Sequence, residues 1–507
     1  MPIPFWRRRL LTRILRRPPR GPRRLSVLVV ALALIATWQW DFFRQAPRLD
    51  RRYVHRQASG MNDEHRFLYF LYYLGLYPVV SNEGHSRMRD EPGYRKFNAE
   101  AAKRVVAESG DTLAMETRQT IRAGEMGRSL LYLPYAMWTG SARNPRLAPT
   151  HAVAFTVALA ALFTALWWAR DPVLGALVVG LLGSNPYQLA EVHATENIFG
   201  WTITTGILAL ALSLPLLRRR GAGRRAGLSP LLVGALLGTV RQIRPEPVTI
   251  LASAAAASLT LARASWPRRI ALAALLVATF MLSSRLWLAY FDHKFEQARQ
   301  VVAAAGGSVY EGPRDRYHMF WHPFWCGLGD FGQEYGYLWW DRAAYRYAIP
   351  LVQARYEALG RQPDWRFLVW DPVYNEVLAA KIKRDITDHP FWYAGVLVRR
   401  VLRVLTWTTP VRLAAGTWWV TLPWNGLAVL PLLALLAFTR SWSVLKLALF
   451  PLGSSLSAIL IFSGTLPGQT YSGWFHVVGA AIVLAALVEA LRVLGRRPWR
   501  TRSTTRG

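Results

Sequence analysis

Long apolar segments bordered by arginine are the feature that most constrains this 507-residue chain. Each segment is long enough, or nearly so, to cross roughly 30 Å of hydrocarbon. Hydrophobic residues make up 52% of the chain, and 23 tryptophans with a formal charge of +32 are an unusual combination for a soluble enzyme. The sequence therefore predicts an all-α polytopic membrane protein with about nine to eleven spans. The most apolar segments are 26–43, 151–168, 197–217, 270–290, 424–438 and 472–494.

The positive charge is concentrated at the ends of these segments. Nine arginines lie within the first 24 residues, and further clusters lie at 218–225, at Arg268 and Arg269, and after Gly495. This distribution is the positive-inside pattern, which predicts that both termini are cytoplasmic. Anionic lipid headgroups are the expected partners of the arginines. Nucleic-acid binding is disfavoured, because no basic and aromatic reading module is present.

The first 45 residues could be mistaken for a signal peptide. Their apolar stretch is too long for one and no small-residue cleavage site follows it, so we expect an uncleaved first span. Cys326 is the single cysteine, which rules out an intramolecular disulfide and disfavours a cysteine-based metal site. The preference for arginine over lysine and the abundance of alanine indicate a bacterium with GC-rich DNA. The predicted location is therefore the bacterial inner membrane.

Alternation of spans from a cytoplasmic N-terminus divides the chain into parts. Predicted spans over 149–168, 172–184, 197–217, 229–241, 246–263 and 270–290 follow a long first external loop, 44–148. Helix 391–408 contains three arginines, which would be costly in a spanning segment, so it is expected to lie along the interface. The predicted parts are a basic cytoplasmic N-terminus (1–25), a transmembrane core (26–290), a mixed extracytoplasmic domain (291–390), C-terminal helices (391–495) and a basic cytoplasmic tail (496–507).

This topology places several ionisable residues on the external face of the membrane, where they are candidates for function. Simpler interpretations remain open for each. Asp63 is a favoured N-cap residue for the helix that begins there, and Glu196 could interact with a helix macrodipole. Arg244 and Glu246 could be an interfacial anchor pair.

Four stretches of the chain are notable: DEHRFLYFLYYLGLYP (63–78), NPYQLAEVHATENIF (185–199), GTVRQIRPEPVTIL (238–251) and DITDHPFWYAGVLVRRVLRVL (385–405). They resemble motifs of the GT-C glycosyltransferases, in the same order, over roughly residues 25–410. Within that superfamily they most resemble the protein O-mannosyltransferases and the lipid A aminoarabinose transferases. Two elements depart from the family pattern: GEMGRSLLYLPYAMW lacks a Lys-Pro-Pro element, and GQTYSGWFH stands where an Arg-Tyr pair is frequent.

The resemblance implies transfer of a sugar from a polyprenyl-phosphate carrier to a hydroxyl or amide, with inversion at the anomeric carbon. Asp63 would be the general base, with Glu64 as its supporting neighbour, because a partly desolvated carboxylate is a better base. Arg241 and Arg244 would contact the carrier phosphate through their planar guanidinium groups. Glu196 would orient the acceptor or bind a cation. The cofactor stays open, with a divalent cation as one candidate, and the supporting residues are Arg66, His193 and Glu246.

Other functions and another site remain open. A transporter or flippase for a polyprenyl-linked glycan is disfavoured by the absence of an internal repeat, and a non-catalytic scaffold on the same fold is compatible with the missing family elements. The acceptor could be a glycan, a lipid or a protein. His318 and His322 have the i, i+4 spacing of metal ligands on a helix. Pro323 and the surrounding aromatic residues indicate a packed or interfacial segment instead, so the sequence predicts no metal ligand.

Overall fold

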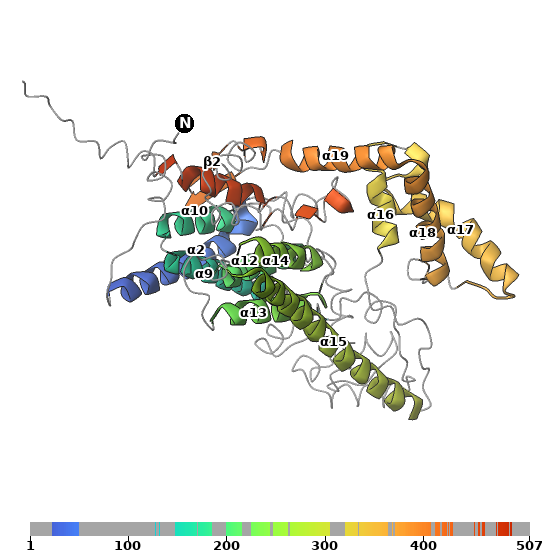
Figure 1. Ribbon diagram of the computed structural model, residues 1–507, viewed down its shortest axis with the longest axis horizontal. Coiled ribbons are helices and arrows are strands. Elements are labelled where there is room, and N and C mark those ends of the chain that lie inside the picture. The colour runs from blue at the N-terminus through green and yellow to red at the C-terminus, as the bar shows by residue number, and fades with distance from the viewer. Residues whose placement is uncertain are drawn as a thin grey trace, which may run out of the picture.

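A computed structural model shows a mainly α-helical protein, and the residues that it describes include one short antiparallel strand pair (Figure 1). The prediction of a mainly helical fold is confirmed at this level, whereas the number of membrane spans stays a prediction. The described residues are 23–49, 148–169, 171–184, 199–214, 225–243, 247–261, 264–304, 320–332, 334–363, 371–406, 411–415 and 418–422, with Gly127, Leu131, Leu368, Trp424, 426–428 and parts of 451–488.

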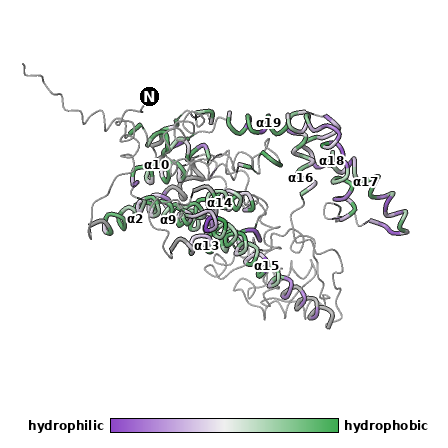
Figure 2. The backbone as a smooth tube through the Cα atoms, in the orientation of Figure 1, coloured by the Kyte–Doolittle hydropathy of each residue, from purple (hydrophilic) through white to green (hydrophobic). Residues whose placement is uncertain are grey.

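Each helix described before residue 305 coincides with a predicted apolar span. The last of these helices is longer than predicted, since it continues past residue 290 into a polar stretch; Figure 2 shows this change from hydrophobic to hydrophilic along it. The predicted start of the extracytoplasmic domain at residue 291 therefore lies inside a helix. The helices are α2 (Arg23–Leu49), α9 (Ala148–Trp168), α10 (Pro172–Gly183), α12 (Phe199–Ser213), α13 (Arg225–Val240), α14 (Pro247–Leu261) and α15 (Trp266–Ala304).

A turn with strong local signals joins α9 to α10. Asp171 is the N-cap of α10, and its carboxylate accepts a hydrogen bond from the Leu174 amide at 3.1 Å. Pro172 occupies the first helical position, where no amide proton is needed. Gly175 then lets α10 approach α9, because a Cβ atom there would lie 3.3 Å from Leu166. The two helices consequently pack closely against each other.

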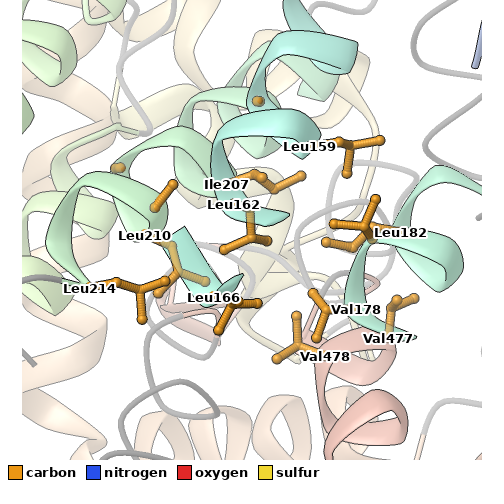
Figure 3. Close-up of a cluster of buried hydrophobic side chains, with 14 of the residues drawn as sticks. Leu159, Leu162, Leu166, Val178, Leu182, Ile207, Leu210, Leu214, Val477 and Val478 are labelled. Atoms are coloured by element: carbon orange, nitrogen blue, oxygen red, sulfur yellow. The ribbon is translucent and has the colours of Figure 1, made fainter. Parts of the chain in front are cut away.

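An aliphatic cluster occupies the centre of this helical bundle (Figure 3). Its side chains come from α9, α10 and α12, and from helical residues 475–485 near the other end of the chain. These helices are apolar on nearly every side, which is typical of helices in a large core or a membrane. The labelled members are Leu159, Leu162, Leu166, Val178, Leu182, Ile207, Leu210, Leu214, Val477 and Val478.

Helices α13 and α15 pack at very short range through two glycines. Cβ atoms at Gly234 and Gly238 would each lie 2.6 Å from a carbonyl oxygen of α15, that of Leu276 or of Phe280. Ser283 donates a hydrogen bond across the interface to the Ala235 carbonyl at 3.0 Å. Small residues four apart with hydrogen bonds between helices are the usual packing mode of membrane helices.

Two helices of the described chain are long and apolar enough to cross a membrane. They are the Pro149–Trp168 part of α9 and the Trp266–His293 part of α15. This criterion alone is weak evidence, because core helices of soluble proteins also meet it. The apolar parts of the other apolar helices in the described chain are shorter, at 10–17 residues, and that of α2 is Leu25–Asp41.

A second group of helices follows α15 and has its own core. Aromatic rings fill this core, including those of Trp325, Tyr337 and Tyr374, all of them fully buried. The group consists of α16 (Trp321–Leu328), the 3-10 turn η2 (Glu334–Gly336), α17 (Asp341–Ala358), α18 (Pro372–Asp388) and α19 (Pro390–Thr406); after it come the paired strands β1 (Val411–Ala415) and β2 (Trp418–Leu422) and the 3-10 turn η4 (Gly426–Ala428).

Helix α19 corresponds to the arginine-containing helix predicted to lie along the interface. Arg400 is fully buried and pairs with Asp330 at 3.2 Å, and the Arg403 guanidinium lies 3.9 Å from the centre of the Phe331 ring. Two of the three arginines thus contact other parts of the protein: Arg400 pairs with a carboxylate, and Arg403 lies over an aromatic ring. The apolar residues Phe391, Val398 and Leu402 are exposed instead.

Candidate functional site

Of the predicted site residues, Arg241 lies within the described part of the chain. The roles of the others stay predictions. The predicted site residues outside the described residues are Asp63, Glu64, Arg66, His193, Glu196, Arg244 and Glu246.

Arg241 begins the turn that follows α13. Its amide continues the helical pattern by donating to the Leu237 carbonyl at 2.9 Å. Its Nη1 atom donates to the Ser284 hydroxyl of α15 at 3.0 Å, and its guanidinium carbon lies 5.7 Å from the centre of the Phe280 ring. The side chain is half-buried. The cation is therefore held in a fixed position against α15, at the level where α13 ends.

The next residue, Gln242, connects this turn to the predicted first external loop. Its buried side-chain amide donates to the Ser284 hydroxyl at 3.2 Å. Its carbonyl accepts a hydrogen bond from the amide of Gly127 at 3.0 Å. A Cβ atom at Gly127 would lie 2.8 Å from that of Gln242, so the approach favours glycine. The structure thus brings a residue of the predicted loop 44–148 to the turn that precedes Arg244.

A second polar cluster lies between α16, α17 and α18. His322 and Cys326 are one helical turn apart on α16, so their side chains lie on the same face. Asp341 is the first residue of α17, and its carboxylate oxygen lies 3.1 Å from Nε2 of His322 and 3.8 Å from Sγ of Cys326. Nδ1 of His322 lies 2.6 Å from the hydroxyl of Tyr374 on α18. One imidazole therefore bridges two helices that are distant in sequence.

The members of this cluster differ in exposure. His322, Cys326 and Tyr374 are buried, whereas the Asp341 side chain is 72% exposed. The histidine, thiol and carboxylate ligand atoms all lie within 4.8 Å of one another. The described residues thus contain one group whose composition could hold a metal ion, with its carboxylate facing solvent.

Burial and charge set the protonation of this cluster. Burial, together with the negative charge of Asp341, raises the pKa of the Cys326 thiol to about 12. The hydrogen bond with His322 lowers the pKa of Asp341, against a smaller opposing effect of burial. Burial also raises the pKa of the Tyr374 phenol. At neutral pH without a metal, the cluster is consequently a protonated thiol and a neutral phenol around an ionised carboxylate.

The sequence did not predict this arrangement. The sequence spacing pairs His322 with His318, which lies outside the described residues, and a single cysteine disfavours a cysteine-based metal site. The pattern His322-x-x-x-Cys326 has the same one-turn spacing and was the available local signal. Asp341 could not have been identified from spacing, because its proximity depends on how α17 packs beside α16.

A separate buried network joins α18 to the turn η2. Asp385 accepts hydrogen bonds from Lys381 at 2.6 Å and from the Tyr337 hydroxyl at 2.8 Å. The Lys381 ammonium also lies 5.0 Å from the centre of the Tyr337 ring. Because the carboxylate is paired with a cation and a phenol within the core, this network has the character of a structural contact.

Comparison of the chain with protein-family models, with curated proteins and with solved structures gives no match.

Proposed function

We propose that this protein is a membrane glycosyltransferase of the GT-C type. It transfers a sugar from a polyprenyl-phosphate donor to an acceptor on the extracytoplasmic face, and it inverts the anomeric centre. The proposal rests on the ordered set of motifs that resemble this family. The structural observation that supports it best is the hydrogen bond between Gly127 and Gln242, because it joins the predicted first external loop to the turn that begins with Arg241.

The helical packing supports the membrane part of this proposal. Exposed apolar side chains line α2, including Leu25, Val29 and Leu34, and α15, including Leu282 and Leu286. In water such surfaces would be unfavourable, whereas lipid chains would cover them without cost. The glycine-mediated contact of α13 with α15 is likewise typical of membrane helices. We therefore infer a multi-pass protein of the bacterial inner membrane with both termini cytoplasmic.

Arg241 is proposed as a cation that contacts the donor phosphate. The donor is a lipid, so its phosphate lies at the membrane surface, where spans end. Negative charge develops on that phosphate as the sugar leaves, and a preorganised guanidinium stabilises it. The contacts of Arg241 with Ser284 and Phe280 restrict its side chain, so little ordering is needed when the phosphate binds. Arg244 would complete the phosphate site.

Asp63 is proposed as the general base toward the acceptor hydroxyl, with Glu64 beside it. A hydroxyl is a weak nucleophile, and removal of its proton in the transition state typically contributes 10²- to 10⁴-fold in rate, as an order-of-magnitude figure. Glu196 would orient the acceptor or bind a divalent cation. Glycan, lipid and protein acceptors are all compatible with this chemistry.

The test is the effect of Asp63→Asn on envelope glycans. A deletion strain would be complemented with wild type, with Asp63→Asn, or with Asp90→Asn, a matched change in the same predicted loop. Mass spectrometry of the glycans and lipid-linked sugars is expected to show product with wild type and Asp90→Asn, and accumulated donor with Asp63→Asn. Size-exclusion chromatography in detergent would establish that all three fold.

Arg241 provides a second, independent comparison. Arg241→Ala is expected to weaken donor use, whereas Arg285→Ala, which removes an exposed arginine from the neighbouring part of α15, is expected to leave it unchanged. Full product formation by a folded Asp63→Asn protein would refute the enzymatic proposal and favour a flippase or a scaffold.

A further inference from the structure

The cluster of His322, Cys326 and Asp341 has a composition that selects among metal ions. Magnesium and calcium prefer oxygen ligands alone, whereas zinc binds thiolate, imidazole and carboxylate together. His322 and Cys326 both lie on α16, whereas Asp341 is the first residue of α17. A metal ion bound by all three would therefore link the start of α17 to α16. We propose that His322, Cys326 and Asp341 form a zinc site in the second group of helices.

Two of the three ligand separations are close to those of a tetrahedral zinc site before any metal is bound, and all three ligand atoms lie within 4.8 Å of one another. With usual bond lengths, tetrahedral ligands would lie about 3.4 Å apart for nitrogen and oxygen and about 3.6 Å apart for sulfur and oxygen. The corresponding separations here are 3.1 Å between His322 and Asp341 and 3.8 Å between Cys326 and Asp341. Shifts of a few tenths of an ångström would therefore be sufficient for these two pairs of ligands.

Tyr374 contacts the ring nitrogen of His322 that does not face Asp341. Metal-binding imidazoles usually donate their second ring N–H to a fixed oxygen, which sets the tautomer and the ring orientation. The Tyr374 hydroxyl lies 2.6 Å from Nδ1, on the side of the ring away from Asp341, and it is fully buried. When Nε2 binds zinc, Nδ1–H donates to this hydroxyl. The supporting contact that a zinc-bound histidine requires is thus already built into α18.

The charges balance with one proton released. Zinc binding converts the Cys326 thiol to a thiolate, whose proton goes to solvent, and the zinc-bound imidazole is neutral with its proton on Nδ1. One thiolate and one carboxylate then neutralise the two positive charges of zinc. Because Asp341 is exposed, the fourth position faces solvent and is filled by water. This site is independent of the proposed glycosyl transfer, since none of its residues belongs to the predicted transferase site.

The single cysteine gives a specific spectroscopic test with cobalt as a substitute for zinc. A thiolate bound to Co²⁺ produces a near-ultraviolet charge-transfer band, and in this chain such a band can arise from Cys326 alone. Detergent-solubilised full-length protein is expected to show the band on addition of Co²⁺ and to lose it on addition of Zn²⁺, but not of Mg²⁺. Absence of the band from folded wild-type protein would overturn the proposal.

Variants separate a metal site from an unspecific effect on folding. Cys326→Ser and His322→Gln are expected to abolish the band. Asp341→Asn changes an exposed side chain and should fold normally while binding cobalt more weakly, whereas Asp388→Asn, also exposed, should match wild type. Tyr374→Phe is expected to reduce zinc affinity by about 10- to 100-fold. Equal binding by Asp341→Asn and Asp388→Asn would exclude Asp341 as a ligand and refute the three-residue site.

A measurement on wild-type protein alone covers the case in which core variants fail to fold. Cys326 alkylation by a maleimide would be timed in zinc, in magnesium and in a chelator. Zinc is expected to slow the reaction relative to the other two conditions, because the thiolate is coordinated. Equal rates in all three would refute zinc binding at this thiol.

Discussion

Removal of the Asp330 carboxylate is expected to loosen the second group of helices strongly. In Asp330→Asn, the Arg400 guanidinium keeps its charge but loses its counter-ion, and both side chains of the pair are almost completely buried, at 0% and 1% exposure. Breaking such a pair by removing one partner costs about 3 to 5 kcal/mol. Arg400 still donates to the carbonyls of Ile459 and Leu460 at 3.2 and 3.0 Å. We therefore expect the lower end of the range, about 3 kcal/mol.

The single cysteine allows this loss of stability to be measured at one position, Cys326. Cys326 is buried in α16, four residues before Asp330, so a maleimide reacts with it mainly when this region opens. If reclosing is fast, the labelling rate follows the opening equilibrium. A loss of about 3 kcal/mol then corresponds to labelling that is roughly 100-fold faster. The assay would use detergent-solubilised protein with a chelator, so that metal binding does not protect the thiol.

Two controls define the result that would refute this reasoning. Arg355 and Glu376 form an ion pair at 3.0 Å between exposed side chains, so Glu376→Gln should cost under about 1 kcal/mol and change labelling by less than about fivefold. The double variant Asp330→Asn with Arg400→Met removes the buried charge and should label more slowly than Asp330→Asn alone. Labelling of Asp330→Asn at the Glu376→Gln rate would show that burial of Arg400 does not control the opening of α16.

Two further predictions concern packing and capping. Gly238→Val should force α13 away from α15, because even a Cβ atom would lie 2.6 Å from the Phe280 carbonyl, and thermal unfolding in detergent should show a loss of about 1 to 3 kcal/mol in stability. Gly227→Ala has open space around the new methyl group and should be neutral or stabilising. Equal stability of the two variants would contradict the close contact between the helices. Asp371→Ala should destabilise α18 by about 1 to 2 kcal/mol, because Asp371 accepts hydrogen bonds from the Val373 amide at 2.8 Å and the Tyr356 hydroxyl at 2.6 Å. Asp371→Asn should retain most of the cap. Equal rates of Cys326 labelling in the two variants would argue against a capping role.

The sequence predicted the helices of the first half of the chain well, whereas the roles of its site residues stay predictions. Apolar runs located α9 and α15, and Asp171 with Pro172 marks the start of α10, because these signals act between neighbours in the chain. The end of α15 was placed too early, since an amphiphilic helix continues after its apolar part without a local stop signal. For the site, the sequence identified Arg241 by resemblance, and the structure adds its contacts with α15.

What the sequence determined by itself is therefore the composition and order of the helices: apolar runs fix where helices form, and clustered arginines give the predicted orientation in a membrane. Tertiary structure alone decided which distant side chains meet. Asp330 reaches Arg400 across 70 residues, and Asp341 and Tyr374 reach His322 from two different helices. The physical reason is that a buried charge or imidazole needs a partner in space, at any separation along the chain, and such pairings leave no period in the sequence.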